Sequence, residues 1–290
     1  MNQPSNVLRI TFWMLVSAAG FACLMALARH LHNTGMHVLV LSFWRNLFAV
    51  GVFIPWIFRL GLPALKSRRH PEFFLRGVIF VTSSLTLLWA ATIMPIAEVT
   101  AITFTAPLFS TILAVMIMKE TIRWRRIAAL LVGFAGVMLM LRPGVEAIQL
   151  GAVLSLVSAF LFGFIVIMGK RLNETESPEV VILMLSFWSL PISAIPAAFY
   201  WQVPEGDQWY YLIALGIAAN LNMYGIQRAL SLGDVSLTQV FDFARLPLTF
   251  IIAYFAFDET LDIWFWMGGI IISAAAVYTT RRETAQASDT

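Results

Sequence analysis

The chain has 290 residues, of which 60% are hydrophobic and 12% are charged, and its formal net charge is +3. Soluble domains are roughly half apolar and about one quarter charged, so this composition excludes a water-soluble protein and indicates one embedded in a lipid bilayer. The basic residues cluster beside apolar segments, as is usual in membrane proteins, so we expect no nucleic-acid partner. The single cysteine, Cys23, excludes an internal disulfide.

Ten apolar segments follow one another along the chain, each close to the roughly 20 residues that a helix needs to cross a bilayer. The expected helices cover residues 10–29, 37–58, 74–93, 97–118, 124–142, 150–170, 179–201, 208–228, 235–257 and 263–281. The connecting segments are short, and the tail at 283–290 has the composition of a disordered segment. The sequence therefore predicts an all-α integral membrane protein with ten transmembrane helices.

Lysine and arginine are distributed unevenly between alternate connections. If the N-terminus is cytoplasmic, only Arg29 and Arg142 fall at the outer ends of the helices, and the other basic residues near helix ends fall inside. Since Lys and Arg in short loops set membrane topology, we expect both termini to be cytoplasmic in a multi-pass protein of the bacterial inner membrane.

Short motifs recur about 140 residues apart along the chain. "LSFW" occurs at 41–44 and again at 185–188, and "MKETIRW" at 118–124 is echoed by "FDETLDIW" at 257–264. Each half then holds five helices, so the second half must cross the membrane in the opposite sense. The basic loop "KSRRH" of the first half corresponds to the neutral-to-acidic "VPEGDQ" of the second, as such an inversion requires. We expect two inverted repeats, at 1–143 and 144–282, an arrangement that builds secondary transporters.

These features resemble the EamA-type drug/metabolite transporter superfamily. The matching residues are a proline in the fourth and ninth helices, a glutamate that ends each of them and an arginine in the second helix: Pro107, Pro247, Glu120, Glu259 and Arg45. The most family-like stretches are "ATIMPIAEVTAITFTAPLFSTILAVMIMKE" at 91–120 and "GFAGVMLMLRP" at 133–143. The resemblance implies a ten-helix bundle around a central cavity that works by alternating access without ATP. The first half is also similar to bacterial S-adenosylmethionine and riboflavin uptake carriers.

Three ionisable residues lie deep within apolar segments: Arg45, Asp242 and Arg245. An ionisable side chain at bilayer depth costs from about 2.5 to over 10 kcal/mol, so these groups should face the interior of the bundle. Asp242 and Arg245 are three residues apart and can pair on one helix face; the pair either joins helices or also lines the cavity. Two arginines against one aspartate leave a positive interior, which favours an anionic or amphoteric solute.

Further candidates for substrate contact come from polar and aromatic side chains. Asn220 and Tyr224 lie on one face of the eighth segment, although amides in apolar helices also hold helices together. Trp44, Trp89 and Phe241 could stack on a planar ligand or serve packing alone. Pro107 and Pro247 are expected to bend matched helices and act as paired hinges. The histidines at 30, 32 and 37 lack a metal-ligand spacing, so neither a metal nor a cofactor is expected.

These observations predict a secondary transporter that moves a small organic metabolite by alternating access. A broad-range small-molecule exporter is the alternative, although it would need a mostly apolar cavity. A membrane-embedded enzyme would need an acid paired with a nucleophile, or a metal cluster, at membrane depth; we therefore do not expect an enzyme. The sequence leaves open the solute, the direction of flux, a coupling ion and whether the chain forms a homodimer.

Overall fold

The structure is a computed structural model. It describes residues 4–60, 67, 69–94, 96–103, 105–119, 124–141 and 150–242, together with scattered positions between 245 and 274. All regular secondary structure among these residues is helical, as the composition and the lengths of the apolar segments predict. Pro247, Glu120, Glu259, most of the expected helix at 263–281 and the tail at 283–290 lie outside the described residues.

The helices follow the predicted order, with boundaries that differ by a few residues at most ends. Their bounds are α1 (Pro4–Asn33), α2 (Val38–Leu60), α3 (His70–Ile93), α4 (Ile96–Thr103), α5 (Ala106–Met118), α6 (Trp124–Leu141), α7 (Leu150–Leu172), α8 (Pro178–Ala197), the 3-10 turn η2 (Ala198–Tyr200), α9 (Gln208–Leu232) and α10 (Val235–Asp242). The start of α8 shows why a helix begins where it does. The Ser177 hydroxyl accepts a hydrogen bond from the N–H of Val180, and Pro178 occupies the first turn, where no N–H is needed.

The helix expected at 97–118, with a bend at Pro107, is interrupted in the structure, where two helices, α4 and α5, cover this segment. Thr105 forms a turn between them, in which its N–H donates to the carbonyl of Ile102 at 3.0 Å. Pro107 has no N–H to donate to the carbonyl of Thr103, so regular helical hydrogen bonding cannot continue through this point. Pro107 consequently lies in the first turn of α5 and not in the interior of one long helix.

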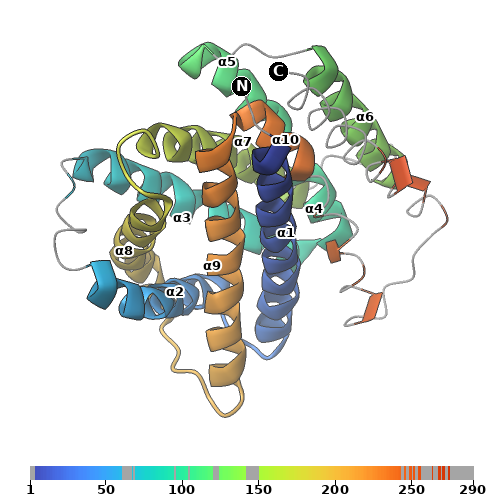
Figure 1. The fold of residues 1–290 in the computed structure, drawn as a ribbon. Helices are drawn as coiled ribbons and strands as arrows, with labels where there is room; N and C mark the ends of the chain where they lie inside the picture. The colour runs from blue at the N-terminus through green and yellow to red at the C-terminus, as the bar shows by residue number, and fades with distance from the viewer. Residues whose placement is uncertain are drawn as a thin grey trace.

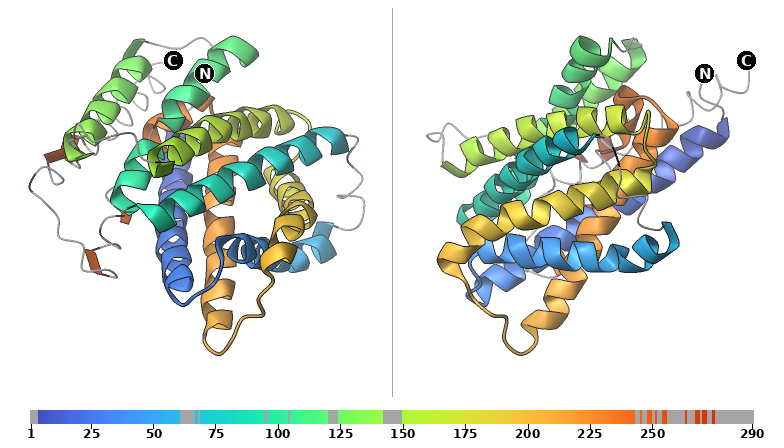
Figure 2. Two further views of the ribbon diagram at one scale, coloured as in Figure 1. Left: turned by 180° about the vertical axis from the view of Figure 1, so that it is seen from behind. Right: turned by 90° about the vertical axis from the view of Figure 1, so that its left-hand side faces the viewer.

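The longest packing contacts join helices from opposite halves of the chain. Helix α1 packs along α9, α3 packs along α7, and α2 packs along α8. Figures 1 and 2 show α1 and α9 running side by side. Two glycines bring this pair together: a Cβ on Gly20 would lie 2.6 Å from the backbone nitrogen of Asn222, and one on Gly225 would lie 2.5 Å from the carbonyl oxygen of Trp13. Small residues permit this backbone contact, as they commonly do between membrane helices.

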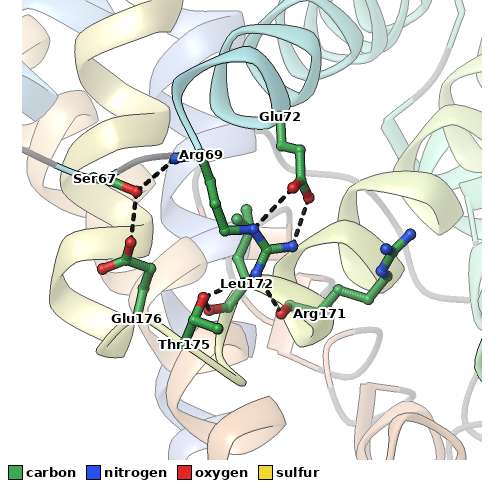
Figure 3. A network of polar contacts seen from close by, with 7 residues as sticks. All are labelled: Ser67, Arg69, Glu72, Arg171, Leu172, Thr175 and Glu176. Atoms are coloured by element: carbon green, nitrogen blue, oxygen red, sulfur yellow. Dashed lines mark hydrogen bonds and ion pairs between the residues drawn. The ribbon is translucent and has the colours of Figure 1, made fainter.

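Polar contacts join the helices at one end of the bundle, which we call the charged end (Ser67, Arg69, Glu72, Arg171, Thr175 and Glu176; Figure 3). Arg69 donates to the carbonyl oxygen of Arg171 at 3.0 Å and to the Thr175 hydroxyl at 2.9 Å, and it pairs with Glu72 at 2.6 Å. Ser67 donates to the carboxylate of Glu176. These bonds connect the segment before α3 with the segment that follows α7.

Aromatic rings gather at the opposite end of the bundle, which we call the aromatic end (His37, Trp44, Tyr200, Trp201 and Trp209). The ring centroid of Trp44 lies 5.7 Å from that of Trp201 and 5.2 Å from that of Trp209. His37 stacks on Tyr200 with centroids 4.0 Å apart. The indole N–H of Trp44 also donates to the carbonyl oxygen of Gln202 at 3.3 Å. The turn before α2 is thereby held against the segment between α8 and α9.

Four described helices are long and apolar enough to cross a membrane: Asn6–Asn33, His70–Ile93, Leu150–Leu172 and Pro178–Tyr200. Val38–Val52 and Leu108–Met118 are shorter apolar helices within the described residues. These four helices confirm that the protein has membrane-spanning helices. They do not confirm all ten of the predicted spans. Helix α9 has sufficient length, but its amides at 220, 222 and 227 and the guanidinium at 228 make it less apolar.

Candidate binding cavity

A cavity of about 60 Å³ lies where α1, α2, α3, α7 and α9 converge, beside the end of α4 and the start of α5. The residues that line it are mostly apolar, with a few polar side chains and two arginines: Phe21, Leu24, Arg45, Phe80, Ser83, Ser84, Leu87, Thr103, Ala106, Ser158, Ala159, Phe162, Ala219, Asn222, Met223 and Arg245. An apolar wall with a few convergent polar groups is typical of small-molecule sites. Both arginines that the sequence singled out therefore reach one cavity.

Arg45 projects from α2 and is 3% exposed. Its Nη1 donates to the hydroxyl of Ser84 on α3. Its Nε and Nη2 both donate to Oδ1 of the neighbouring Asn46, at 3.3 and 2.9 Å. The guanidinium also lies 5.3 Å from the centroid of the Phe80 ring, a favourable cation–π distance.

Asp242 and Arg245 form an ion pair, as their spacing predicts. Nη2 of Arg245 lies 3.1 Å from Oδ2 of Asp242, and both side chains are at most 4% exposed. The Arg245 guanidinium lies 4.1 Å from the centroid of Phe21 on α1. Arg245 thus lines the cavity. Asp242 pairs with it but is not among the lining residues.

Among the described residues, the charges around the cavity do not balance. Asp242 offsets Arg245, whereas no carboxylate among the described residues pairs with Arg45. A buried charge that lacks a partner is costly, and the neutral groups Asn46 and Ser84 compensate Arg45 only partly. The cavity therefore presents an excess of positive charge on the α2 side, where an anionic group would be stabilised.

Two other predicted substrate contacts lie outside the cavity. Asn220 donates to the carbonyl oxygen of Ala49 at 2.8 Å and so joins α9 to α2, in the manner expected of an amide that holds helices together. The Tyr224 hydroxyl donates to Glu179 at 3.1 Å, and its ring packs edge-on against Trp13. Both residues are on α9, but their side chains point toward neighbouring helices and not into the cavity.

The predicted aromatic contacts also lie away from the lining residues. Trp44 belongs to the aromatic end, and Trp89 is 49% exposed on the outer surface of α3. Phe241 is 2% exposed and packs in an apolar cluster with residues of α1, α5 and α7. Among the described residues, the rings that reach the cavity are Phe21, Phe80 and Phe162. The helices are rich in Phe, so the helical period of the sequence could not show which phenylalanines face the cavity.

Sequence reasoning missed two polar residues that the structure makes prominent. Asn46 orients Arg45, and its position directly after an arginine in an apolar segment was a usable signal. Arg76 was assigned to a basic cluster at a helix end, yet it is 2% exposed. It donates to Gln227 Oε1 at 2.9 Å and to the carbonyl oxygens of Ile165 and Val181 at 3.3 and 3.4 Å. It therefore links α3 to α7, α8 and α9.

The described residues contain no group of three or more His, Cys, Asp or Glu side chains that could hold a metal ion. What the cavity offers is a pair of guanidinium groups on aromatic rings, with hydroxyl and amide groups beside them. Such an arrangement can bind and orient a solute by charge and stacking.

A model of the EamA-like transporter family matches residues 8–142 and matches again over residues 149–281. The chain belongs to the EamA-like transporter family. The resemblance carried by the prolines, the glutamates and Arg45 is therefore confirmed at the level of the family. The two matches also agree with an internal repeat.

Individual relatives of this EamA-like protein cover nearly the whole chain. A riboflavin transporter of Vibrio cholerae is 28% identical over 288 residues, which are 98% of this chain and 97% of that protein. An S-adenosylmethionine uptake transporter of Rickettsia felis is 28% identical over 266 residues, which are 92% of this chain and 90% of that protein. One crystal structure superposes with a TM-score of 0.73 at 18% identity and covers 92% of this chain and 98% of that chain, which shows a shared fold.

Family, relatives and apolar helices together identify this EamA-like protein as a multi-pass membrane transporter for a small metabolite. They also point to transport and not to catalysis.

Proposed function

We propose that the protein is a secondary transporter of the bacterial inner membrane and that its solute is a small organic metabolite with an anionic group, either anionic or amphoteric overall. The observation that carries this proposal is Arg45, a buried guanidinium that faces the cavity and has no carboxylate partner among the described residues. A solute carboxylate or phosphate would supply the missing charge and could accept two parallel hydrogen bonds. Arg245, held by Asp242, would contact a second part of the solute.

The cavity volume favours alternating access. About 60 Å³ holds a few water molecules, whereas ligand sites usually need about 300–1,000 Å³. The helices must therefore move apart to admit a metabolite and close again behind it. The pairing of α1 with α9 and of α3 with α7 supports two inverted repeats, at 1–143 and 144–282, with both termini cytoplasmic. In this mechanism the break at Pro107 and the matched Pro247 serve as hinges.

The relatives suggest the first solutes to test. Riboflavin is neutral, whereas S-adenosylmethionine is amphoteric and carries a carboxylate that suits Arg45. Thermal unfolding of the detergent-purified protein should shift upward with a true ligand, because binding stabilises only the folded state. A screen should include flavins, sulfonium metabolites, amino acids and nucleosides.

Uptake into proteoliposomes tests the proposal directly. With a ligand from the screen that carries an anionic group, Arg45→Ala and Arg245→Ala should each abolish uptake while the protein still folds and inserts. Arg9→Ala changes the same residue type on an exposed part of α1 and should leave uptake intact. Undiminished uptake in both cavity variants would falsify the proposed anion site.

A further inference from the structure

We propose that Asn46 is the positioning residue that makes the cavity selective for anions, an inference that rests on the proposed function. Asn46 is 3% exposed and is not among the residues that line the cavity. It acts through Arg45: its amide fixes the direction of the guanidinium but brings no negative charge.

The orientation of the Asn46 amide follows from its partners. Its Nδ2 donates to the Ser193 hydroxyl at 3.0 Å and to the carbonyl oxygen of Ser189 at 3.5 Å, both on α8. A carbonyl oxygen only accepts hydrogen bonds and a guanidinium only donates them. The amide nitrogen must therefore face α8, and the amide oxygen must face Arg45.

Asn46 accepts from one edge of the Arg45 guanidinium, and Ser84 occupies only part of the other. Nε and Nη2 share the amide oxygen, and Nη1 donates to Ser84. A guanidinium has five N–H donors, so these three bonds leave two without a partner among the described residues. Because Arg45 and Ser84 both line the cavity, the remaining donors belong to a side chain that reaches it and can serve a carboxylate or phosphate there.

The choice of amide over carboxylate is what matters at position 46. An aspartate there would accept the same two hydrogen bonds and would also neutralise Arg45 within its own helix. The excess positive charge would then disappear, and an entering anion would gain nothing from Arg45. Asparagine accepts from the guanidinium without that neutralisation, and its Nδ2 also donates to Ser193 and Ser189, which an aspartate could not do. Charge compensation is then left to the solute.

Two ligand pairs that differ in one anionic group provide the test. S-adenosylmethionine and its decarboxylated form differ by a carboxylate, and flavin mononucleotide and riboflavin differ by a phosphate. For the wild-type protein, at least one anionic member should bind more tightly than its partner. In Asn46→Asp, the affinity for that anionic member should fall by about tenfold or more, the loss expected for one charge-assisted hydrogen-bonded contact, while the partner compound binds as before.

A second variant protects the test against misfolding. Asn46→Ala leaves Arg45 charged but unanchored, so the anionic member should bind more weakly yet remain the preferred one. A purely structural role would change the affinity for both members of a pair alike.

The outcomes separate this inference from the proposed function. If wild type prefers the anionic member and Asn46→Asp keeps the same preference, the role of Asn46 is overturned and the anion site stands. If wild type binds both members of a pair and shows no preference for the anionic one, the anion site and the role of Asn46 are both overturned.

Discussion

At the charged end, Arg69 ties the start of α3 to Thr175 beyond α7, whereas at the aromatic end Trp44 lies against Trp201 and Trp209. The first set of contacts is polar and partly exposed, and each such contact is worth little in water. The second set buries the large apolar side chain of Trp44, which is 9% exposed, and burial of one such ring contributes much more than an exposed polar contact. The contacts at the two ends should therefore respond differently to salt. Added salt should weaken the contacts of the charged end and leave those of the aromatic end unchanged.

The largest effect should come from the aromatic end. Trp44→Ala removes a side chain that is 9% exposed, with its ring contacts and its bond to Gln202. Truncation of a buried tryptophan costs about 3–5 kcal/mol, so thermal unfolding in detergent should occur at a clearly lower temperature. Trp89→Ala is the control, because Trp89 is 49% exposed and should lose little. Equal effects of the two variants would contradict the assigned role of the aromatic end.

A smaller but still substantial loss of stability should come from replacing the buried Arg76. Arg76→Met keeps much of the apolar stem and removes the donors that reach Gln227, Ile165 and Val181. An acceptor that is left unsatisfied in the interior costs about 1–3 kcal/mol, and we expect a loss in that range. Arg76→Lys should recover only part of it, since one ammonium cannot reach all three acceptors. Full stability of Arg76→Met would show that the buried polar link is dispensable.

The smallest effect should come from the exposed contacts of the charged end. Hydrogen bonding to Glu72 raises the pKa of Arg69 above its ordinary value, so this pair stays charged across the usual pH range. Arg69→Gln should destabilise the protein by only about 0.2–1 kcal/mol. The difference from wild type should shrink as salt is raised from 0.05 to about 1 M. A difference that persists at high salt would mean that the charged end is held by something other than ion pairing.

Much of the fold was predictable because the membrane restricts the possibilities. Backbone groups in lipid must be satisfied within the chain, so long apolar segments become helices, and α1, α3, α7 and α8 lie close to where hydropathy placed them. The break at Thr105 was not predicted as such. Pro107 indicated a disturbed helix, but its effect on local hydrogen bonding depends on the backbone around it.

The site was predicted where the cost of burial decided the outcome. Charged groups in lipid are expensive, which is why Arg45 and Arg245 could be assigned to the interior and do line one cavity. Trp89 and Tyr224 carry no such penalty, and a helical period does not reveal which neighbour a given face meets. Arg76 was missed because it lies near a helix end, where an arginine ordinarily extends toward water.

The close approach of α1 and α9 at Gly20 and at Gly225 limits how this protein can move. With the backbones of α1 and α9 touching, neither helix can rotate or slide past the other without a steric clash. We expect a change of conformation to move both helices together, although they come from opposite halves of the sequence. The moving units of the transport cycle would then be mixed pairs of helices, and cross-links between α1 and α9 should be compatible with turnover.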